Sequence, residues 1–553
     1  MGGTSMAQSQ GGASHGMRWF RPGEIAFVMQ APTDGNELRS LHSEVRGAIE
    51  KRLAGRSGGT FQPEQSRQQP IIFRSPRKPP LAFLFYELAQ QDSSDAVKQV
   101  LTELDTSSLD DVRAVGGEPL AAMPSWHTTA QQAAFGGGSP GSVPRAVPGS
   151  EIPRTPDARW SYMYRPTDPD LDLVDQVKGV VEADRVRVAV LDTSPKRAQV
   201  EEQARRFGAT NAQLADVAAL LGTHEAPSDP PDLKPGQLRR TRATEPPPRY
   251  SMADHGLFVA SLIRAIAPHT KIEFEPVLSE HGIGELERFL RTLARLVSTK
   301  GMDEPLIINL SLGFSPHPER MPHIWYGLNE TSDEDDLGEP VQRLIGQADE
   351  RVRGQRDEMR RMSSLLHLGL ERLSAYLLDA NCLVIAAAGN DSTKLAASGR
   401  PRLGPRLPAR YDSVLGVAAT ARNPQTAAAY SNMGDSWELG DHVAAFGGDV
   451  DDNDQPRDGV IGAYSAPYFP DVDTGQPSPS LPNDTGWAYW SGTSFSTAIV
   501  AGIAANYWTA RRAARPTPPQ ADDMLYALSS EAGAYIPALR TRSIQITSEW
   551  RRV

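Results

Sequence analysis

Short apolar segments that alternate with helical segments constrain the fold of this chain most. Three of them carry apolar residues on both faces: Val188-Ala189-Val190-Leu191, Leu306-Ile307-Ile308-Asn309-Leu310 and Asn381-Cys382-Leu383-Val384-Ile385. Such runs are typical of strands buried inside a parallel sheet. Further strands are predicted over residues 271–278 and 414–419, with helices between them. The expected fold class is therefore α/β, with a doubly wound, mostly parallel sheet.

Four polar residues stand where these strands end or where helices begin. Asp192 follows the strand over 188–191, and Asn390 ends the strand that begins at residue 381. His255 precedes an apolar helical run, and Ser494 stands at the entry of an Ala-rich helix. Ligand sites of α/β sheets gather at strand carboxyl ends, and the first NH groups of a helix can stabilise an oxyanion. Taken singly, each residue has an ordinary explanation as a turn or capping residue.

The first part of the chain has a different pattern. Strands are predicted over residues 24–29, 70–73, 81–86 and 112–123, with helices over 38–53 and 93–104. The order β-α-β-β-α-β is that of a ferredoxin-like α+β domain. Residues from about 130 to 169 are rich in Gly, Pro, Ser and Ala, a composition typical of linkers. The predicted organisation is a flexible N-terminus (1–19), a small domain (20–125), a linker (126–170) and a large domain (171–553) with insertions near 195–250, 314–378 and 448–488.

Bulk properties exclude several classes of function. A net charge of −11 without a dominant basic cluster argues against nucleic-acid binding. No segment is long and apolar enough to span a membrane, and the N-terminus lacks the apolar core of a secretory signal. Cys382, as a single cysteine, allows no intrachain disulfide. We therefore expect a cytoplasmic protein.

The combination of these residues in this order resembles the subtilisin-like serine peptidases, in which the chain order is Asp, His, Asn, Ser. The resemblance extends over about residues 184–507. The matching motifs are His255-Gly256 with Val259-Ala260, Ala387-Ala388-Gly389-Asn390, and Gly492-Thr493-Ser494 with Val500-Ala501-Gly502. Two positions depart from the family pattern: Ser194 stands in place of a glycine and Ala498 in place of a proline. Neither change removes a reacting group, so the resemblance implies an active peptidase.

The resemblance also implies a role for each residue. Ser494 would attack the peptide carbonyl, His255 would act as general base and then general acid, and Asp192 would orient the imidazole. Asn390 and the Ser494 backbone NH would bind the oxyanion. Asp254, next to His255, is the alternative acid to Asp192. Extended substrate would pair with two edges, which comprise Gly282, Gly284, Ser311, Leu312 and Gly313.

No cofactor is required for this chemistry. Many relatives bind calcium, so a structural calcium ion is an open expectation. The acidic run that contains Asp449, Asp451, Asp452 and Asp454 is interpreted as a solvated loop, because it lacks the glycine and closing glutamate of an EF-hand-type loop. We therefore assign no residue as a metal ligand.

The domain over residues 20–125 leaves two interpretations open. By resemblance it is a propeptide that inhibits the enzyme until self-cleavage in the linker; the alternative is a permanent regulatory or partner-binding domain. Three functions follow. The first is a serine endopeptidase acting on protein or peptide substrates. The second is a catalytically latched or inactive peptidase-fold protein that binds peptides. The third is an interaction protein that docks a regulatory partner at the 314–378 insertion.

Overall fold

The computed structural model describes residues 20–552 with gaps, and the largest gaps are 230–250 and 315–366. The smaller gaps are residues 33–34, 54–60, 63–68, 76, 89–93, 107–117, 131–142, 152–157, 165–172, 209, 223–225, 302–303, 435–441, 451–457, 472–475, 531 and 545. The predicted flexible N-terminus (1–19), most of the 314–378 insertion and the first part of the predicted long helix up to residue 366 therefore lie outside the described residues. In the part of the chain that is described, no helix combines the length and apolarity needed to cross a membrane.

An eight-stranded sheet forms the centre of the larger unit, which we call the main unit (residues 143–552 as described). Its strand order is β20-β21-β15-β14-β13-β11-β8-β9. The strands are β8 (Arg187–Asp192), β9 (Ile272–Pro276), β11 (Leu306–Leu310), β13 (Cys382–Ala387), β14 (Val414–Thr420), β15 (Val443–Phe446), β20 (Tyr535–Ile536) and β21 (Thr541–Ser543). All neighbouring pairs are parallel except β20 with β21. The predicted mostly parallel sheet is confirmed.

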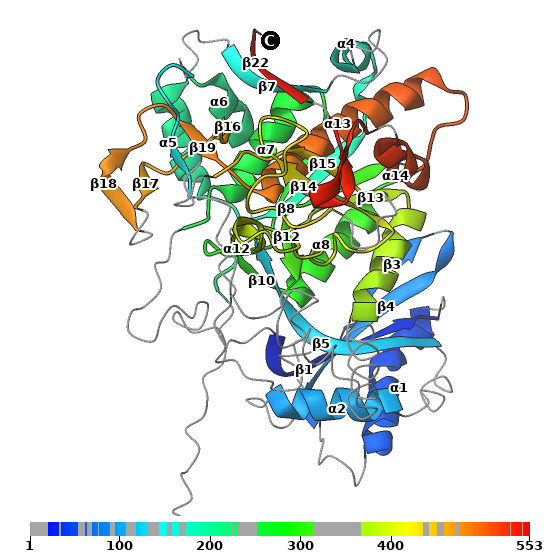
Figure 1. Ribbon diagram of the computed structural model, residues 1–553. Helices are drawn as coiled ribbons and strands as arrows, with labels where there is room; N and C mark the ends of the chain where they lie inside the picture. The colour runs from blue at the N-terminus through cyan, green and yellow to red at the C-terminus, as the bar shows by residue number, and fades with distance from the viewer. Residues whose placement is uncertain are drawn as a thin grey trace, which may run out of the picture.

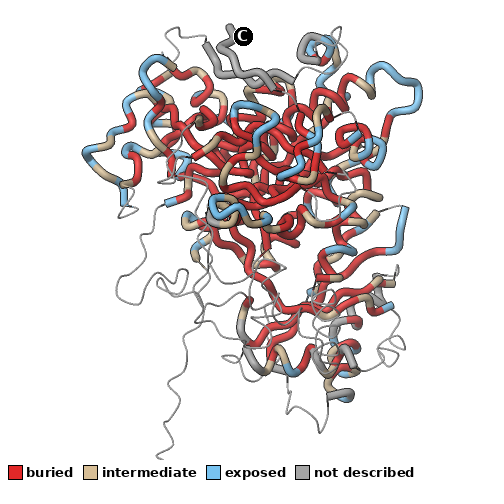
Figure 2. The backbone as a smooth tube through the Cα atoms, in the orientation of Figure 1, coloured by how far each residue is buried: buried red, intermediate tan, exposed pale blue. Residues whose placement is uncertain are grey.

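The two faces of this sheet carry two separate cores. Successive residues of β8, β11 and β13 alternate between the cores, as a strand period of two requires. One core contains Val188, Ile307 and Leu383 and packs against α7 (His255–Ile266) and α13 (Thr493–Ala514). The other contains residues such as Ile308 and packs against α8 (Leu286–Thr299) and a helix described over residues 367–379. Figure 2 shows this dense buried region in the upper half of the molecule.

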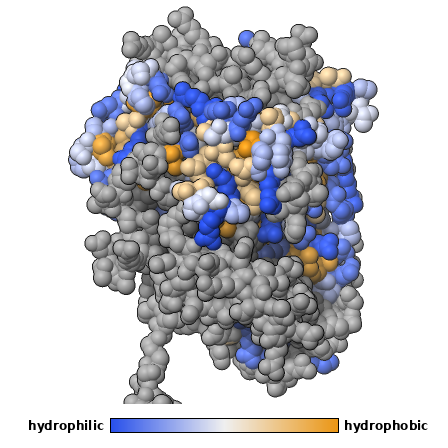
Figure 3. Space-filling model, viewed as in Figure 1, coloured by the Kyte–Doolittle hydropathy of each residue, from blue (hydrophilic) through white to orange (hydrophobic). Residues whose placement is uncertain are grey.

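Smaller elements surround the main sheet. A three-stranded sheet has the order β16-β19-β6, with β16 (Val460–Ala463), β19 (Trp487–Trp490) and β6 (Arg145–Ala146). A hairpin consists of β17 (Tyr468–Pro470) and β18 (Pro477–Pro482), and β7 (Ala158–Tyr164) pairs with β22 (Ile546–Arg552). The helices of this shell are α4 (Leu173–Lys178), α5 (Arg197–Phe207), α6 (Ala212–Ala218), α12 (Thr393–Ala397) and α14 (Ala521–Ser530). Hydrophilic side chains border apolar ones over the described part of the face in Figure 3.

The first part of the chain forms a second unit, here called the N-terminal unit (residues 20–130 as described). Its strands are β1 (Phe20–Gln30), β2 (Phe61–Gln62), β3 (Ile71–Ser75), β4 (Lys78–Leu88) and β5 (Glu118–Ala130), and its helices are α1 (Gly35–Leu53) and α2 (Ser94–Thr106). β5, β1, β4 and β3 lie side by side and pair antiparallel. The six predicted elements are present, and the short β2 is an addition. In Figure 1, α1 and α2 lie on the side of this sheet remote from the main unit.

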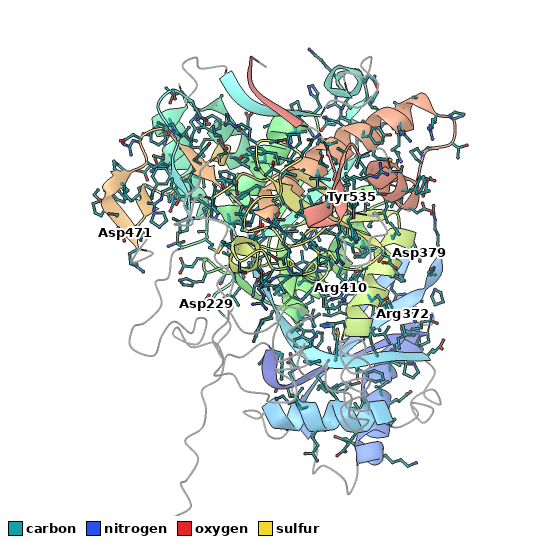
Figure 4. The ribbon with its side chains drawn as sticks, in the orientation of Figure 1. Asp229, Arg372, Asp379, Arg410, Asp471 and Tyr535 are labelled. Atoms are coloured by element: carbon teal, nitrogen blue, oxygen red, sulfur yellow. The ribbon has the colours of Figure 1, made fainter. Side chains whose placement is uncertain are left out.

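The opposite side of the N-terminal sheet packs directly on the main unit. Its apolar residues belong to the same buried cluster as α8 and the helix over 367–379. Tyr376 donates a hydrogen bond to the backbone carbonyl of Phe73, and Asp379, labelled in Figure 4, forms an ion pair with Lys78. The two units therefore share one continuous hydrophobic core.

β5 extends beyond the boundary predicted at residue 125. Its last residues, His127 to Ala130, extend past the end of β1 and pair with β10 (Ile283–Glu285) and β12 (Leu312–Phe314) of the main unit (Figure 1). The predicted linker over 126–170 also contains β6 and β7, which pair with β19 and β22. Three parts of the predicted linker are therefore strands, each paired with a strand that is distant in the sequence: residues 126–130, 145–146 and 158–164.

Candidate active site

The ends of β8 and α7 bring Asp192 and His255 into contact. Asp192 is the last residue of β8 and His255 the first residue of α7. Asp192 Oδ1 lies 2.7 Å from His255 Nδ1, and both side chains are fully buried. The Thr193 backbone NH donates to the same carboxylate oxygen at 2.7 Å. A carboxylate in this position favours the tautomer that carries its proton on Nδ1.

Two neighbours allow β8 and α7 to approach so closely. Thr193 Oγ1 donates to the Met252 carbonyl at 2.8 Å and accepts from the Gly256 NH at 3.1 Å, which ties the strand end to the helix start. A Cβ atom on Gly256 would lie only 2.8 Å from Asp192 Cβ. A side chain at residue 256 would therefore push β8 and α7 apart and separate Asp192 from His255.

Asp254, the alternative acid, makes different contacts. Its carboxylate accepts hydrogen bonds from Ser465 Oγ at 2.5 Å and from the Ala466 NH at 2.6 Å. Burial raises the pKa of Asp254 to about 6, although these hydrogen bonds act in the opposite direction. The structure thus joins Asp192, and not Asp254, to the His255 imidazole.

Ser494 lies in the first turn of α13, beside the same histidine. The ring of the next residue, Phe495, lies 5.6 Å from the His255 ring, and the ring of Trp490 lies 5.7 Å from it. Ser494 Oγ donates to the Ser311 carbonyl at 3.3 Å, and Ser311 Oγ donates to the Ser494 carbonyl at 2.9 Å. Ser494 is fully buried, and His255 Nε2 has no hydrogen-bond partner. The hydroxyl is therefore turned toward Ser311 in this conformation.

Asn390 is bound to the turn that carries Ser494. Its Oδ1 accepts hydrogen bonds from both the backbone NH and Oγ1 of Thr493, each at 2.9 Å. Thr493 Oγ1 also accepts from the Gly389 NH at 3.2 Å. Because Oδ1 accepts both of these hydrogen bonds, Nδ2 is the group of the amide that can donate to an oxyanion. This arrangement can present an N–H group near the Ser494 turn.

The two predicted substrate edges are occupied by β5. Ile283, Gly284 and Glu285 pair antiparallel with Thr129, Thr128 and His127. Leu312, Gly313 and Phe314 pair with Ala130, Thr129 and Thr128 on the other side. A Cβ atom on Gly284 would come within 2.6 Å of Thr128 Oγ1. An extended peptide thus lies between both edges, and its described end at Ala130 is paired next to Ser311.

Not every predicted edge residue belongs to the ladder. Gly282 has a φ of 75° and its NH donates to the Ser279 carbonyl, so it forms the turn before β10. Ser311 lies just before β12 and contacts Ser494 instead. Thr193 and Thr493 were not singled out from the sequence, although both are hydroxyl residues adjacent to proposed catalytic residues, and that adjacency was the available signal.

Among the described residues, no three His, Cys, Asp or Glu side chains come together as a metal site. Asp449 Oδ1 accepts a hydrogen bond from the Ala429 NH. Asp451, Asp452 and Asp454 lie outside the described residues. The expectation of a structural calcium ion stays a prediction, and no catalytic step depends on it.

Comparison with known proteins assigns the family. The model of the "Subtilase family" matches residues 185–527, which is well over half of the chain. The chain therefore belongs to the subtilase family, and its main unit has the subtilisin-like peptidase fold. No curated protein sequence matches the chain.

Several solved structures are similar to this chain at low identity. They include a lanthipeptide protease (19% identity, TM-score 0.39, covering 65% of this chain and 85% of that chain). A serine-to-alanine mutant of the protease domain of PatA has 19% identity and a TM-score of 0.36, with coverages of 65% and 92%. The prenylagaramide maturation protease PagA has 18% identity and a TM-score of 0.37, with coverages of 68% and 96%. The family assignment depends on the family match and not on these three structures.

Proposed function

We propose that this chain is a serine endopeptidase in which Ser494 attacks a peptide carbonyl, with His255 as general base and then general acid. Asp192 holds the imidazole by the 2.7 Å contact to Nδ1 and stabilises its charged form. Asn390 Nδ2 and the Ser494 backbone NH donate to the oxyanion of the tetrahedral intermediate. The proton taken from Ser494 Oγ passes through His255 to the leaving amine.

The N-terminal unit, which we interpret as a ferredoxin-like domain, acts in this proposal as an inhibitor that the enzyme itself cuts. One observation carries this proposal: the end of β5 is paired on both sides by β10 and β12, next to the Ser311 carbonyl that accepts from Ser494 Oγ. A peptide bound in this way has the extended backbone that a substrate would present. The full burial of Ser494 agrees with a site that other substrates cannot enter while β5 is in place.

The expected cut lies shortly after Ala130. Residues 131–142 are outside the described part of the chain, and β6, which follows them, is paired with β19 of the main unit. A cut in this interval would separate the N-terminal unit covalently and leave β6 and β7 on the main unit. This proposal narrows the expected site of self-cleavage from the whole predicted linker (126–170) to the interval between residues 130 and 143.

Intact-mass analysis of the purified wild type and Ser494→Ala, each incubated alone, tests the proposal. We expect the wild type to lose everything before a cut between residues 130 and 143, and Ser494→Ala to stay whole. If both stay whole, a fluorophosphonate probe is added to both. Labelling that depends on Ser494 would support a peptidase with a permanent N-terminal domain. The absence of both cleavage and labelling would refute a self-cleaving peptidase and favour the latched, peptide-binding protein.

A second function, a latched protein that binds peptides, is favoured by one contact. Ser494 Oγ donates to the Ser311 carbonyl, whereas His255 Nε2 has no partner. In a protein that only binds, this arrangement would persist after β5 leaves. The fluorophosphonate probe distinguishes the two functions, because a hydroxyl that stays on Ser311 reacts no faster than it does in a His255→Ala variant.

A further inference from the structure

The loop that carries Asn390 is held on the side of the serine turn by Thr493, as described above, and on its other side by Asn432. The Asn432 NH donates to the Gly389 carbonyl at 2.9 Å, and Asn432 Nδ2 donates to the Ala388 carbonyl at 3.1 Å. Asn432 Oδ1 accepts from the Asp391 NH at 3.0 Å. One fully buried side chain therefore contacts the residues on both sides of Asn390.

A buried ion pair continues this arrangement. Arg406 Nε donates to Asp391 Oδ2 at 2.7 Å, and a second guanidinium nitrogen binds Asp391 Oδ1. Asn432 Nδ2 donates to Asp391 Oδ2 at 2.8 Å, and the Arg406 NH donates to the Ala388 carbonyl at 2.9 Å. Arg406 is 6% exposed and Asp391 9% exposed. Burial acts to lower the pKa of Arg406, but the charge of Asp391 and its hydrogen bonds together raise it, so the guanidinium stays charged.

Gly389 brings these groups against the backbone directly before Asn390. Its φ is 109°, a conformation that favours glycine. A Cβ atom there would lie 2.5 Å from Asn432 Nδ2, 2.9 Å from Asp391 Oδ2 and 3.1 Å from Arg406 Cδ. The side chains of Asn432, Asp391 and Arg406 thus pack directly against the backbone at Gly389. A displacement of the Asp391–Arg406 ion pair would therefore move the backbone that carries Asn390.

We propose that Arg406, Asp391 and Asn432 are positioning residues that fix the direction of the Asn390 amide. They act through Asn390 and do not contact the reacting atoms. A bidentate arginine–carboxylate pair has a fixed geometry, and oxyanion stabilisation depends on donors that are held within about 0.5 Å of the productive position. The inference depends on the oxyanion role proposed for Asn390 and goes beyond it by naming the residues that hold it.

The test is the first-order rate of self-cleavage, followed by intact mass, in two backgrounds. The double variant Asp391→Leu with Arg406→Met removes both charges and keeps similar volume, which buried ion pairs often tolerate. We expect it to slow cleavage at least tenfold, while in an Asn390→Ala background the same changes alter the rate less than threefold. Arg187→Met with Glu273→Leu is the matched control, because it also removes both charges of a largely buried ion pair, here at the opposite end of β8 from Asp192, and it should leave the rate unchanged.

Other results would overturn the inference. An equal loss in both backgrounds would mean that the ion pair supports the fold in general, and a wild-type rate in the double variant would mean that it positions nothing. If the double variant shows no cooperative thermal unfolding, Arg406→Lys is compared in the same two backgrounds. Lysine keeps the positive charge but cannot make the two parallel hydrogen bonds to the Asp391 carboxylate. A wild type without Ser494-dependent cleavage or probe labelling refutes the proposed function itself, and this inference with it.

Discussion

Lowering the pH should weaken the docking of the N-terminal unit through one buried histidine. His367, on the helix over 367–379, stacks on Trp126 of β5, with ring centroids 5.8 Å apart and an interplanar angle of 28°. The side chain is 7% exposed, and neither ring nitrogen has a hydrogen-bond partner. Burial, assisted by the positive charge of Arg410 (labelled in Figure 4), lowers the pKa of His367 from 6.5 to about 3.

The size of the effect follows from the two pKa values. When the N-terminal unit separates, His367 becomes exposed and its pKa returns toward 6.5, so the separated state binds a proton between pH 6.5 and pH 3 and the docked state does not. Docking free energy is therefore fully present above pH 6.5 and decreases as the pH falls through this interval. At pH 5 the loss amounts to about 2 kcal/mol, or roughly thirtyfold in the docking equilibrium.

Hydrogen exchange of the peptides that cover residues 118–130 measures this equilibrium, because β5 must separate before its amides exchange. The measurement uses Ser494→Ala to keep the chain whole, and compares His367 with His367→Phe at pH 7.5 and pH 5. Phenylalanine can stack on Trp126 but cannot bind a proton. After correction for intrinsic exchange rates, protection should fall about thirtyfold more in the His367 protein than in the variant. An equal change in both proteins would refute the reasoning.

Three further predictions concern other contacts. Gly369→Leu places a side chain against β1 and β5, so we expect β5 peptides to exchange at least tenfold faster than in Glu371→Leu, which changes an exposed position of the same helix. Because burial raises the pKa of Asp254 from 3.8 to about 6, Asp254→Asn should gain about 2 kcal/mol of stability relative to wild type as the pH rises from 4 to 7, and a relative loss in chemical denaturation would contradict this. Gly256→Ala should reduce self-cleavage at least a hundredfold, while Gly179→Ala, whose nearest atom would be 3.8 Å away, should leave the rate unchanged.

The sequence predicts the main sheet well because its signal is local. Runs such as Leu306–Leu310 are apolar on both faces, and only a strand between two cores satisfies such a run. The end of β8 at Asp192 follows from the same runs, whereas the strand predicted to end at Asn390 ends at Ala387 and Asn390 lies in the loop that follows. The helices that begin at His255 and Thr493 follow from apolar helical density.

The end of β5 was missed because its pairing is not local. Residues His127 to Ala130 lack the apolar alternation of a strand, and their partners in β10 and β12 lie more than 150 residues away. Arg406 was missed for a related reason: it stands in a segment rich in Arg, Pro and Gly that resembles an exposed loop. Arginine is seldom buried unless it is paired, and Asp391 alone gave no sign of that pairing.

β5, which pairs with β1 and also with β10 and β12, has a further consequence for the protein before and after cleavage. As long as the chain is intact, β5 reaches β10 and β12 by an intramolecular step, so the proposed inhibition by the N-terminal unit should be independent of protein concentration. After a cut beyond Ala130, the same contacts hold two separate molecules together. Rebinding of the cleaved N-terminal unit then becomes bimolecular, and the hydrophobic core that it shares with the main unit slows its dissociation. Cleaved protein should therefore become more active on dilution, whereas the intact chain should not.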